Sequence, residues 1–176
     1  DKYKPTTLDE YVLDKDIKQY FKSMISKKTL QNFSMISTPG SGKTTLAKIL
    51  CNELDAQVLF VPCATDGTVD VLRTKIQDFC NALSMEGKIK IVILDEADGL
   101  SVDCQKALRA FIEDYPNACR FIMTCNFPAK IIDALHEGRT MEFEFDFKKP
   151  EYVAEMKEQT VKRVEGILKY EKIKYD

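Results

Sequence analysis

The sequence of 176 residues predicts an α/β fold in which helices cover both faces of a parallel five-stranded sheet. Three observations support this prediction. Short apolar segments alternate with segments of helical periodicity. A glycine-rich stretch at 37–44 joins the first of these strands to a helix. The almost continuously apolar run at 89–94 is typical of a central parallel strand that is buried on both faces.

The expected elements follow one another regularly along the chain. Apolar residues at helical spacing predict a first helix over 15–27. Strands are expected at 33–37, 57–62, 89–95, 119–125 and 140–145. Further helices are expected at 44–54, 69–85, 102–114 and 128–135. After a linker at 146–150, a helix at 151–170 is expected to begin a second unit.

The stretch from Ser37 to Thr44 resembles the phosphate-binding loop Gly-x-x-x-x-Gly-Lys-Ser/Thr. Gly40 and Gly42 allow backbone conformations that other residues avoid, so that N–H groups reach phosphate oxygens. Lys43 is expected to contact the β and γ phosphates, and the Thr44 hydroxyl to ligate Mg²⁺. Ser37 replaces the usual first glycine, which is tolerable if Ser37 has strand-like dihedrals. The expected nucleotide contacts are Thr38, Pro39, Gly40, Ser41, Gly42, Lys43, Thr44 and Thr45.

Two adjacent carboxylates follow the buried strand at 89–95. Asp95 is expected to bind Mg²⁺ directly or through water, and Glu96 to act as the general base for the attacking water. The alternative is that both carboxylates merely cap the next helix, but the phosphate loop upstream favours the chemical role. One βα unit separates this strand from the loop strand, which in P-loop proteins of the additional-strand type implies the spatial order 5-1-4-3-2. Loop and carboxylates together predict hydrolysis of a nucleoside triphosphate.

Length and composition set further limits. The chain is long enough for one full domain and a little more, and its start without methionine indicates a fragment. Its six cysteines have no Cys-x-x-Cys spacing, which indicates buried thiols in a reducing compartment. Without a signal peptide or a membrane-length apolar stretch, we expect an intracellular protein of the cytoplasm, with no membrane partner. A net charge of −2 argues against a uniformly basic nucleic-acid surface but allows a local one.

Five sequence blocks, in register across nearly the whole chain, carry a family resemblance. They are Lys2–Asp9, Thr38–Thr44, Leu94–Asp98, Gln105–Arg109 and Met123–Asn126. They resemble the sliding-clamp loader ATPases of the AAA+ superfamily, nearest to the large subunits of T-even-type phage loaders and then to replication factor C small subunits. An origin in such a phage would place the protein in the host cytoplasm.

The resemblance implies a fold, cofactors and partners. The fold would be a AAA+ P-loop NTPase domain over 1–147, followed by the beginning of a helical lid over 148–176. The cofactors would be ATP and Mg²⁺. The partners would be the other subunits of a ring-like pentamer, a sliding clamp and primer–template DNA.

The resemblance also implies roles for single residues. Asn126 would be the sensor that contacts the γ phosphate or the attacking water. Cys63 stands where the family commonly has an amide that restrains the catalytic glutamate. Arg139 lies one residue later than the family's trans-acting arginine and lacks its flanking serine and cysteine, so a plain surface arginine is the alternative. The adenine pocket would be lined by Tyr3, Pro5, Val12 and Leu13.

Contacts with DNA are expected to be made to phosphates without base readout. Gln105 and Arg109 lie one turn apart on the helix at 102–114. We interpret the helix face that carries these two residues as packing on the helix at 69–85 and coupling the ATP state to DNA. The alternative is that this face is polar only because it is solvated. Candidate phosphate contacts are the helix N-termini near Thr68 and Ser101 and the cations Arg73, Lys75 and Lys106, each of which is alternatively an ordinary surface residue.

Three functions remain open from the sequence. The first is an ATPase subunit of a clamp loader, and the second is another AAA+ DNA machine, such as a Holliday-junction branch-migration motor or a helicase loader. The third is a pseudo-ATPase scaffold that only binds nucleotide. The blocks Lys2–Pro5 and Gln105–Arg109 favour the first over the second. The pseudo-ATPase scaffold is disfavoured because the expected catalytic residues are all present, namely Lys43, Thr44, Asp95, Glu96 and Asn126.

Overall fold

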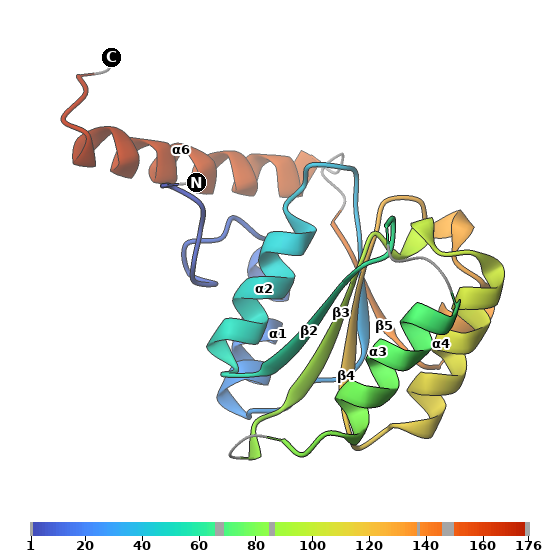
Figure 1. Ribbon diagram of the computed structural model, residues 1–176. Coiled ribbons are helices and arrows are strands. Elements are labelled where there is room, and N and C mark those ends of the chain that lie inside the picture. Colours follow the sequence, from blue (N-terminus) through green and yellow to red (C-terminus); the bar gives the residue numbers. More distant parts are fainter. Residues whose placement is uncertain (1, 66–68, 85–86, 137, 146–149, 175–176) are drawn as a thin grey trace.

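The computed structural model describes residues 2–65, 69–84, 87–136, 138–145 and 150–174. A sheet of five parallel strands lies between two layers of helices (Figure 1). The strands are β1 Phe33–Ile36, β2 Gln57–Pro62, β3 Lys90–Asp95, β4 Arg120–Cys125 and β5 Met141–Glu144. Their spatial order is β2-β3-β4-β1-β5, so the predicted order 5-1-4-3-2 is confirmed.

The helices divide between the two faces of the sheet. Figure 1 shows α1 and α2 on one face and α3 and α4 on the other, while α6 extends beyond the sheet. The helices are α1 Lys15–Ser26, α2 Lys43–Glu53, α3 Val69–Asn81, α4 Val102–Asp114, α5 Asp133–His136 and α6 Pro150–Tyr170. Two 3-10 turns, η2 Ala97–Gly99 and η3 Pro128–Lys130, follow β3 and β4.

Two apolar cores fill the space between the sheet and its helices. Successive side chains of a strand point to opposite faces, and β3 therefore contributes to both cores. Ile91 and Ile93 pack with α1 and α2, whereas Val92 and Leu94 pack with α3 and α4. This double burial explains why β3 is apolar along almost its whole length.

Two predicted helices differ from the structure by more than one residue. The helix expected at 69–85 ends at Asn81, where the Lys90 ammonium group donates to the carbonyl oxygens of Phe79, Cys80 and Ala82. The helix expected at 128–135 is divided into η3 and α5. The Gln105 side chain binds the Lys130 carbonyl and the Ile132 N–H, on either side of Ile131. A continuous helix would use both of these backbone groups for its own hydrogen bonds. Of the predicted linker at 146–150, residues 146–149 lie outside the described residues, and Pro150 begins α6.

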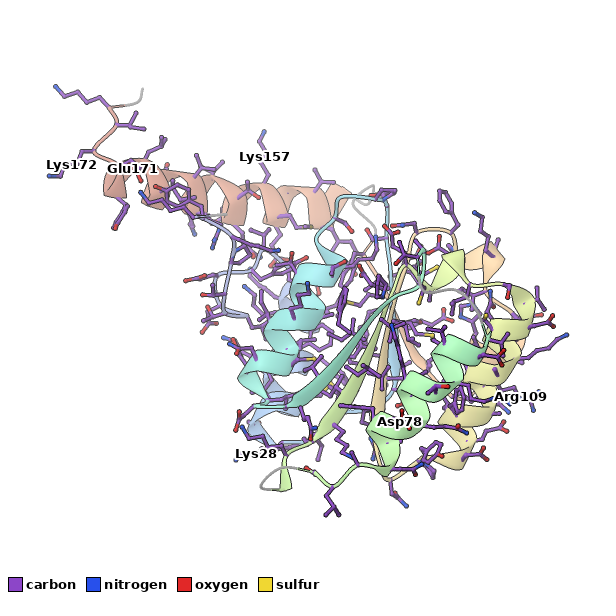
Figure 2. All side chains as sticks on the ribbon, in the orientation of Figure 1. Lys28, Asp78, Arg109, Lys157, Glu171 and Lys172 are labelled. Carbon is purple, nitrogen blue, oxygen red and sulfur yellow. The ribbon has the colours of Figure 1, made fainter. Side chains whose placement is uncertain are left out.

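Helix α6 lies alongside the N-terminal segment. The Gln159 amide nitrogen donates to the Leu13 carbonyl at 2.9 Å, and Arg163 donates to the carbonyls of Glu10 and Tyr3 at 2.6 and 2.9 Å. Figure 2 shows Lys157 pointing away from the sheet, so the opposite face of α6 is the one that docks. In the described part of the chain, no helix has the length and apolarity needed to cross a membrane.

Candidate functional site

The glycine-rich loop connects the end of β1 to the start of α2. Its positive φ angles fall on Gly40 (78°) and Gly42 (89°) and not on Ser37. The Ser37 N–H donates to the Cys125 carbonyl at 3.3 Å, and its hydroxyl donates to the Phe145 carbonyl at 3.1 Å. The position of the missing first glycine therefore continues the sheet pairing and needs no left-handed backbone.

The Lys43 side chain lies within the curve of this loop and is only 6% exposed. Its ammonium group donates to the carbonyl oxygens of Ser37 and Thr38, both at 2.9 Å, and to the Asn126 Oδ1 at 2.8 Å. Burial lowers the pKa of Lys43. A positive charge is thus fixed against the phosphate loop at the N-terminus of α2, and a helix N-terminus with a cation beside it favours phosphate binding.

Three hydroxyl and carboxyl groups meet beside the loop. The hydroxyl groups of Thr44 and Thr124 both donate to the Asp95 Oδ1, at 2.6 and 2.8 Å. The Glu96 N–H donates to the Thr124 hydroxyl at 2.9 Å, and Glu96 has a left-handed φ of 56°. Thr124 was not among the predicted site residues, although a polar residue in the apolar strand β4 was a signal.

The donor set fits Mg²⁺ that is held mainly by phosphates and water. Thr44 and Asp95 offer one hydroxyl and one carboxylate next to the phosphate loop. Within the described ranges, no group of three or more His, Cys, Asp and Glu is placed to hold a metal. Mg²⁺ in nucleotide sites commonly uses one or two protein oxygens together with phosphate oxygens and water.

Asn126 follows β4 and contacts the phosphate loop directly. Its side-chain oxygen accepts from Lys43, and its backbone N–H donates to the Asp98 Oδ1 at 3.2 Å. Asp98 therefore fixes the turn that carries Asn126, a role that the sequence analysis did not assign. The amide lies at the same edge of the sheet as Asp95 and Glu96, because β3 and β4 are parallel neighbours.

A hollow of about 400 Å³ opens beside the phosphate loop. Its wall includes Pro5 and Val12, and an adjoining narrow pocket includes Val12 and Leu13. Tyr3 lies elsewhere, in a hollow with Lys2 and Tyr170, and so is not brought to the loop. Residues that line the two pockets but were not predicted include Tyr11, Tyr152, Met156 and Arg163.

Tyr11 connects the N-terminal segment to the phosphate loop. Its hydroxyl donates to the Ser41 carbonyl at 3.0 Å. A Cβ on Gly42 would lie 2.6 Å from the same hydroxyl, so glycine is required at this contact. Burial raises the pKa of Tyr11 to about 12.

Arg139 lies at the other end of the sheet from the phosphate loop. It precedes Met141, which pairs with Phe33 at the beginning of β1, whereas the loop follows the end of β1. Its Nε and Nη2 donate to the Glu113 Oε1 at 2.8 and 2.5 Å, and its Nη1 donates to the Ala134 carbonyl at 3.0 Å. The guanidinium group is therefore held in a defined position, and Arg139 holds the pKa of Glu113 below its usual range.

Gln105 and Arg109 have different surroundings. Gln105 is 1% exposed, which rules out a solvated role for its side chain. Its Nε2 donates to the carbonyls of Leu100 and Lys130 at 3.1 and 2.9 Å, and its Oε1 accepts from the Ile132 N–H at 2.8 Å. These polar contacts are with the segments after β3 and β4, and not with α3 as interpreted from the sequence.

Arg109 lies on the outer side of α4 (Figure 2), where its Nε donates to the Glu113 Oε1 at 3.2 Å. The candidate DNA contacts are spread over two helices. Ser101 caps α4 by accepting from the Cys104 N–H, and the exposed Lys106 pairs with Asp103. Arg73 and Lys75 are exposed on α3, and Thr68 lies outside the described residues.

Comparisons with known proteins agree with this geometry. Residues 33–149 match the ATPase family associated with various cellular activities (AAA). The chain is similar to the sliding-clamp-loader large subunits of Escherichia phage RB69 and Enterobacteria phage T4, each 37% identical over 175 residues, with 98% of this chain and 54% of the relative covered. It is also similar to the replication factor C small subunit of Sulfolobus acidocaldarius, 34% identical over 182 residues, with 100% of this chain and 54% of the relative covered.

A solved structure with a similar fold is the RuvB Holliday junction branch migration motor of Thermotoga maritima. The TM-score is 0.71 at 17% identity, over 94% of this chain and 56% of that chain, so this likeness concerns the fold alone. The chain spans about half the length of the curated relatives that it matches.

Proposed function

Because this chain belongs to the AAA family of ATPases, we propose that it is the ATPase part of a sliding-clamp loader. Such a protein uses ATP binding and hydrolysis to open a ring clamp and to place it on primer–template DNA during replication. The observation that carries the enzymatic part of this proposal is the meeting of Thr44, Asp95 and Thr124 beside the phosphate loop. The clamp-loader part is supported by relatives of that name that match nearly the whole chain.

The chemistry assigned to the site is hydrolysis of ATP with Mg²⁺. Lys43 binds the β and γ phosphates, and Thr44 and Asp95 hold the metal, which when bound neutralises developing phosphate charge. Glu96 accepts the proton of the attacking water. Its N–H is tied to Thr124, which also bonds to Asp95, and this shared hydroxyl keeps the two carboxylate-bearing residues in a fixed relation.

We assign the adenine to the hollow between the N-terminal segment and α6. Its walls come from both, including Val12 and Met156. Helix α6 is then the first element of a lid over 148–176, on a domain that covers 1–147. ATP in this hollow would contact both units, so that nucleotide binding favours one arrangement of the two.

We assign Arg139 to the ATP of a neighbouring subunit. Its distance along the sheet from its own phosphate loop excludes a role in cis, and its ion pair with Glu113 holds the guanidinium group in place. An arginine that stabilises transition-state charge in this way contributes roughly 10³–10⁵ in rate. The partners are accordingly the other subunits of a ring-like hetero-oligomer, which we take to be a pentamer, working inside the cell.

DNA is proposed to bind through its phosphates, because a loader has to act at any primer end. The N-termini of α3 and α4 and the cations Arg73, Lys75 and Lys106 are the candidate contacts. The buried Gln105 then links α4 to the segments that follow β3 and β4, which carry Glu96 and Asn126. Through these hydrogen bonds, DNA binding at α4 could change the positions of Glu96 and Asn126.

The test is the ATPase rate of the full protein, assembled with its partner subunits, with and without its clamp and primed DNA. We expect clamp and primed DNA together to stimulate hydrolysis, and scrambled primer–template sequences to stimulate it alike. Binding to DNA is expected to weaken with salt with a log–log slope of about −0.9 per duplex phosphate contacted. Stimulation by a four-way junction in place of primed DNA would instead assign the chain to a branch-migration motor.

A further inference from the structure

Two cysteines that the proposed function does not use lie in contact with each other. Cys80 is in the last turn of α3, and Cys119 immediately precedes β4. Their sulfur atoms are 2.9 Å apart, although the residues are 39 positions apart in the sequence. Both side chains belong to the core between the sheet and α3 and α4, with Cys80 6% and Cys119 3% exposed.

A disulfide between them needs only a small movement. A sulfur–sulfur bond is about 2 Å long, so the two sulfur atoms have to approach by roughly 1 Å. The backbones are held by α3 on one side and by the pairing of β4 with β1 and β3 on the other. The fold has therefore already brought together two positions that a disulfide would join.

The surroundings of the pair distinguish the two thiols chemically. The Lys90 ammonium group is buried against the end of α3 and donates to the Cys80 carbonyl at 3.2 Å. The hydrogen bond to Cys119 and the charge of Lys90 lower the pKa of Cys80, whereas the same hydrogen bond and burial raise the pKa of Cys119. The thiolate is the nucleophile in thiol oxidation, and these directions favour Cys80 as the attacking sulfur and Cys119 as the resolving one.

A hollow at one end of the sheet gives a small oxidant access to the Cys119 side of the pair. The Cys80 sulfur does not line this hollow but lies 2.9 Å from the Cys119 sulfur. The hollow has a volume of about 360 Å³ and is lined by Cys119 together with Lys90 and Arg120. Lys28, at the lower edge of Figure 2, also lines it. This end is opposite the phosphate loop, since Cys119 comes before β4 and the loop comes after its parallel neighbour β1.

We propose that Cys80 and Cys119 form an oxidative modification site at which hydrogen peroxide produces an intramolecular disulfide. The Cys80 thiolate attacks one peroxide oxygen and the O–O bond breaks, which gives a sulfenic acid on Cys80 and, after protonation, one water. The Cys119 sulfur then attacks the Cys80 sulfur, the S–O bond breaks, and the leaving hydroxide takes the Cys119 proton as a second water. Both sulfur atoms are oxidised, and peroxide accepts the two electrons.

The new bond would join α3 to β4 and leave the nucleotide site intact. A disulfide that closes a loop of this length stabilises mainly by constraining the unfolded chain. We expect the midpoint of thermal unfolding to rise by about 5–10 °C, because each kcal/mol shifts the midpoint of a domain of this size by roughly 2–4 °C. Affinity for ATP is expected to change less than about twofold, because the bond forms at the far end of the sheet.

The experiment is to treat the reduced full chain with hydrogen peroxide and then to count thiols and map peptides under denaturing conditions. We expect the six free thiols to fall to four, and a peptide pair linked through Cys80 and Cys119 that dithiothreitol separates. Cys51→Ser is the matched control, since Cys51 is a buried thiol in the core on the other face of the sheet, and it should leave the link intact.

The variants Cys80→Ser and Cys119→Ser are each expected to lose the linked peptides and the rise in the unfolding midpoint. Mapping of the unsubstituted chain gives the same assignment if either variant fails to fold. The proposal is overturned if peroxide leaves all six thiols free, links other cysteines, or only adds oxygen to Cys80 without forming the link. A fall in the unfolding midpoint on oxidation would also overturn it.

Discussion

Alanine at Gly42 is expected to destabilise the protein more than alanine at Gly40. Both glycines lie in the phosphate loop with positive φ, at 89° and 78°. A Cβ on Gly40 meets nothing within 4 Å, so Gly40→Ala carries only the cost of the left-handed backbone. A Cβ on Gly42 meets the Tyr11 hydroxyl at 2.6 Å, so Gly42→Ala carries that cost and a steric conflict as well.

The magnitudes follow from these contacts. A left-handed backbone costs a non-glycine residue about 1–2 kcal/mol, which is the expected loss for Gly40→Ala. In Gly42→Ala the Tyr11 ring must move, which breaks its hydrogen bond to Ser41 at about 1 kcal/mol. Overpacking of a buried side chain adds about 1–3 kcal/mol. These three terms sum to about 3–6 kcal/mol. Movement of the Tyr11 ring relieves most of the overpacking, so we expect Gly42→Ala to lose roughly 2–4 kcal/mol.

The assay is urea unfolding without nucleotide, so that phosphate contacts do not contribute. Tyr11→Phe removes the clashing oxygen and leaves the nearest ring carbon at 3.3 Å from the Gly42 Cβ position. In that background the cost of Gly42→Ala should approach that of Gly40→Ala, with a coupling of about 1 kcal/mol in the double-mutant cycle. Equal losses at the two glycines, or no coupling with Tyr11→Phe, would refute the steric reasoning.

Four other predictions concern the site and its connections. Glu96→Gln should keep ATP binding but lower turnover at least about 10²-fold, because the amide cannot accept the water's proton; normal turnover in the assembled complex would exclude Glu96 as the base. Arg139→Ala should reduce hydrolysis only in the assembly, and mixing it with Glu96→Gln subunits should restore some active interfaces. Gln105→Ala leaves buried backbone groups unpaired, so we expect a loss of roughly 1–3 kcal/mol in stability. DNA-stimulated hydrolysis should also weaken while ATP affinity stays nearly unchanged. If hydrolysis falls equally with and without DNA, the substitution causes a folding defect alone. Because burial raises the pKa of Tyr11 to about 12, its protonated form favours the folded state, and the free energy of unfolding should fall as pH rises through 10–12, more steeply than in Tyr11→Phe.

The strand order was predictable because two sequence signals identify the class of P-loop proteins with an additional strand, whose strand order is 5-1-4-3-2. The phosphate loop marks β1, and the carboxylates Asp95 and Glu96 mark the end of β3. Each signal is contained within a few neighbouring residues, so the fold class and the catalytic edge of the sheet follow from them. The C-terminal end of α3 and the division of 128–135 depend instead on Lys90 and Gln105, which bind backbone groups distant in the sequence.

The lining of the hollow beside the phosphate loop was predicted only in part for a similar reason. Val12 was predicted because its segment resembles the one that lines the family's adenine pocket. Its neighbour Tyr11 lies in a segment without periodicity, and the contact of Tyr11 with Ser41 forms only in the folded chain. Met156 comes from α6, far from the loop in sequence, and no local pattern connects the two. Tyr3 lines a neighbouring hollow that shares Glu10 and Arg163 with this one, and its contact with adenine stays a prediction.

Because α6 is long, a small change in how it docks would displace its far end. With 21 residues, the helix is about 30 Å long at 1.5 Å per residue. Met156, which lines the hollow beside the phosphate loop, lies in the first half of the helix, and Glu171, which pairs with Lys2, follows its end. A tilt of about 10° at Met156 would move the end at Tyr170, roughly 21 Å away at the helical rise, by roughly 4 Å. With adenine in this hollow, as proposed above, the helix would transmit a small movement at the nucleotide to its far end beyond the sheet.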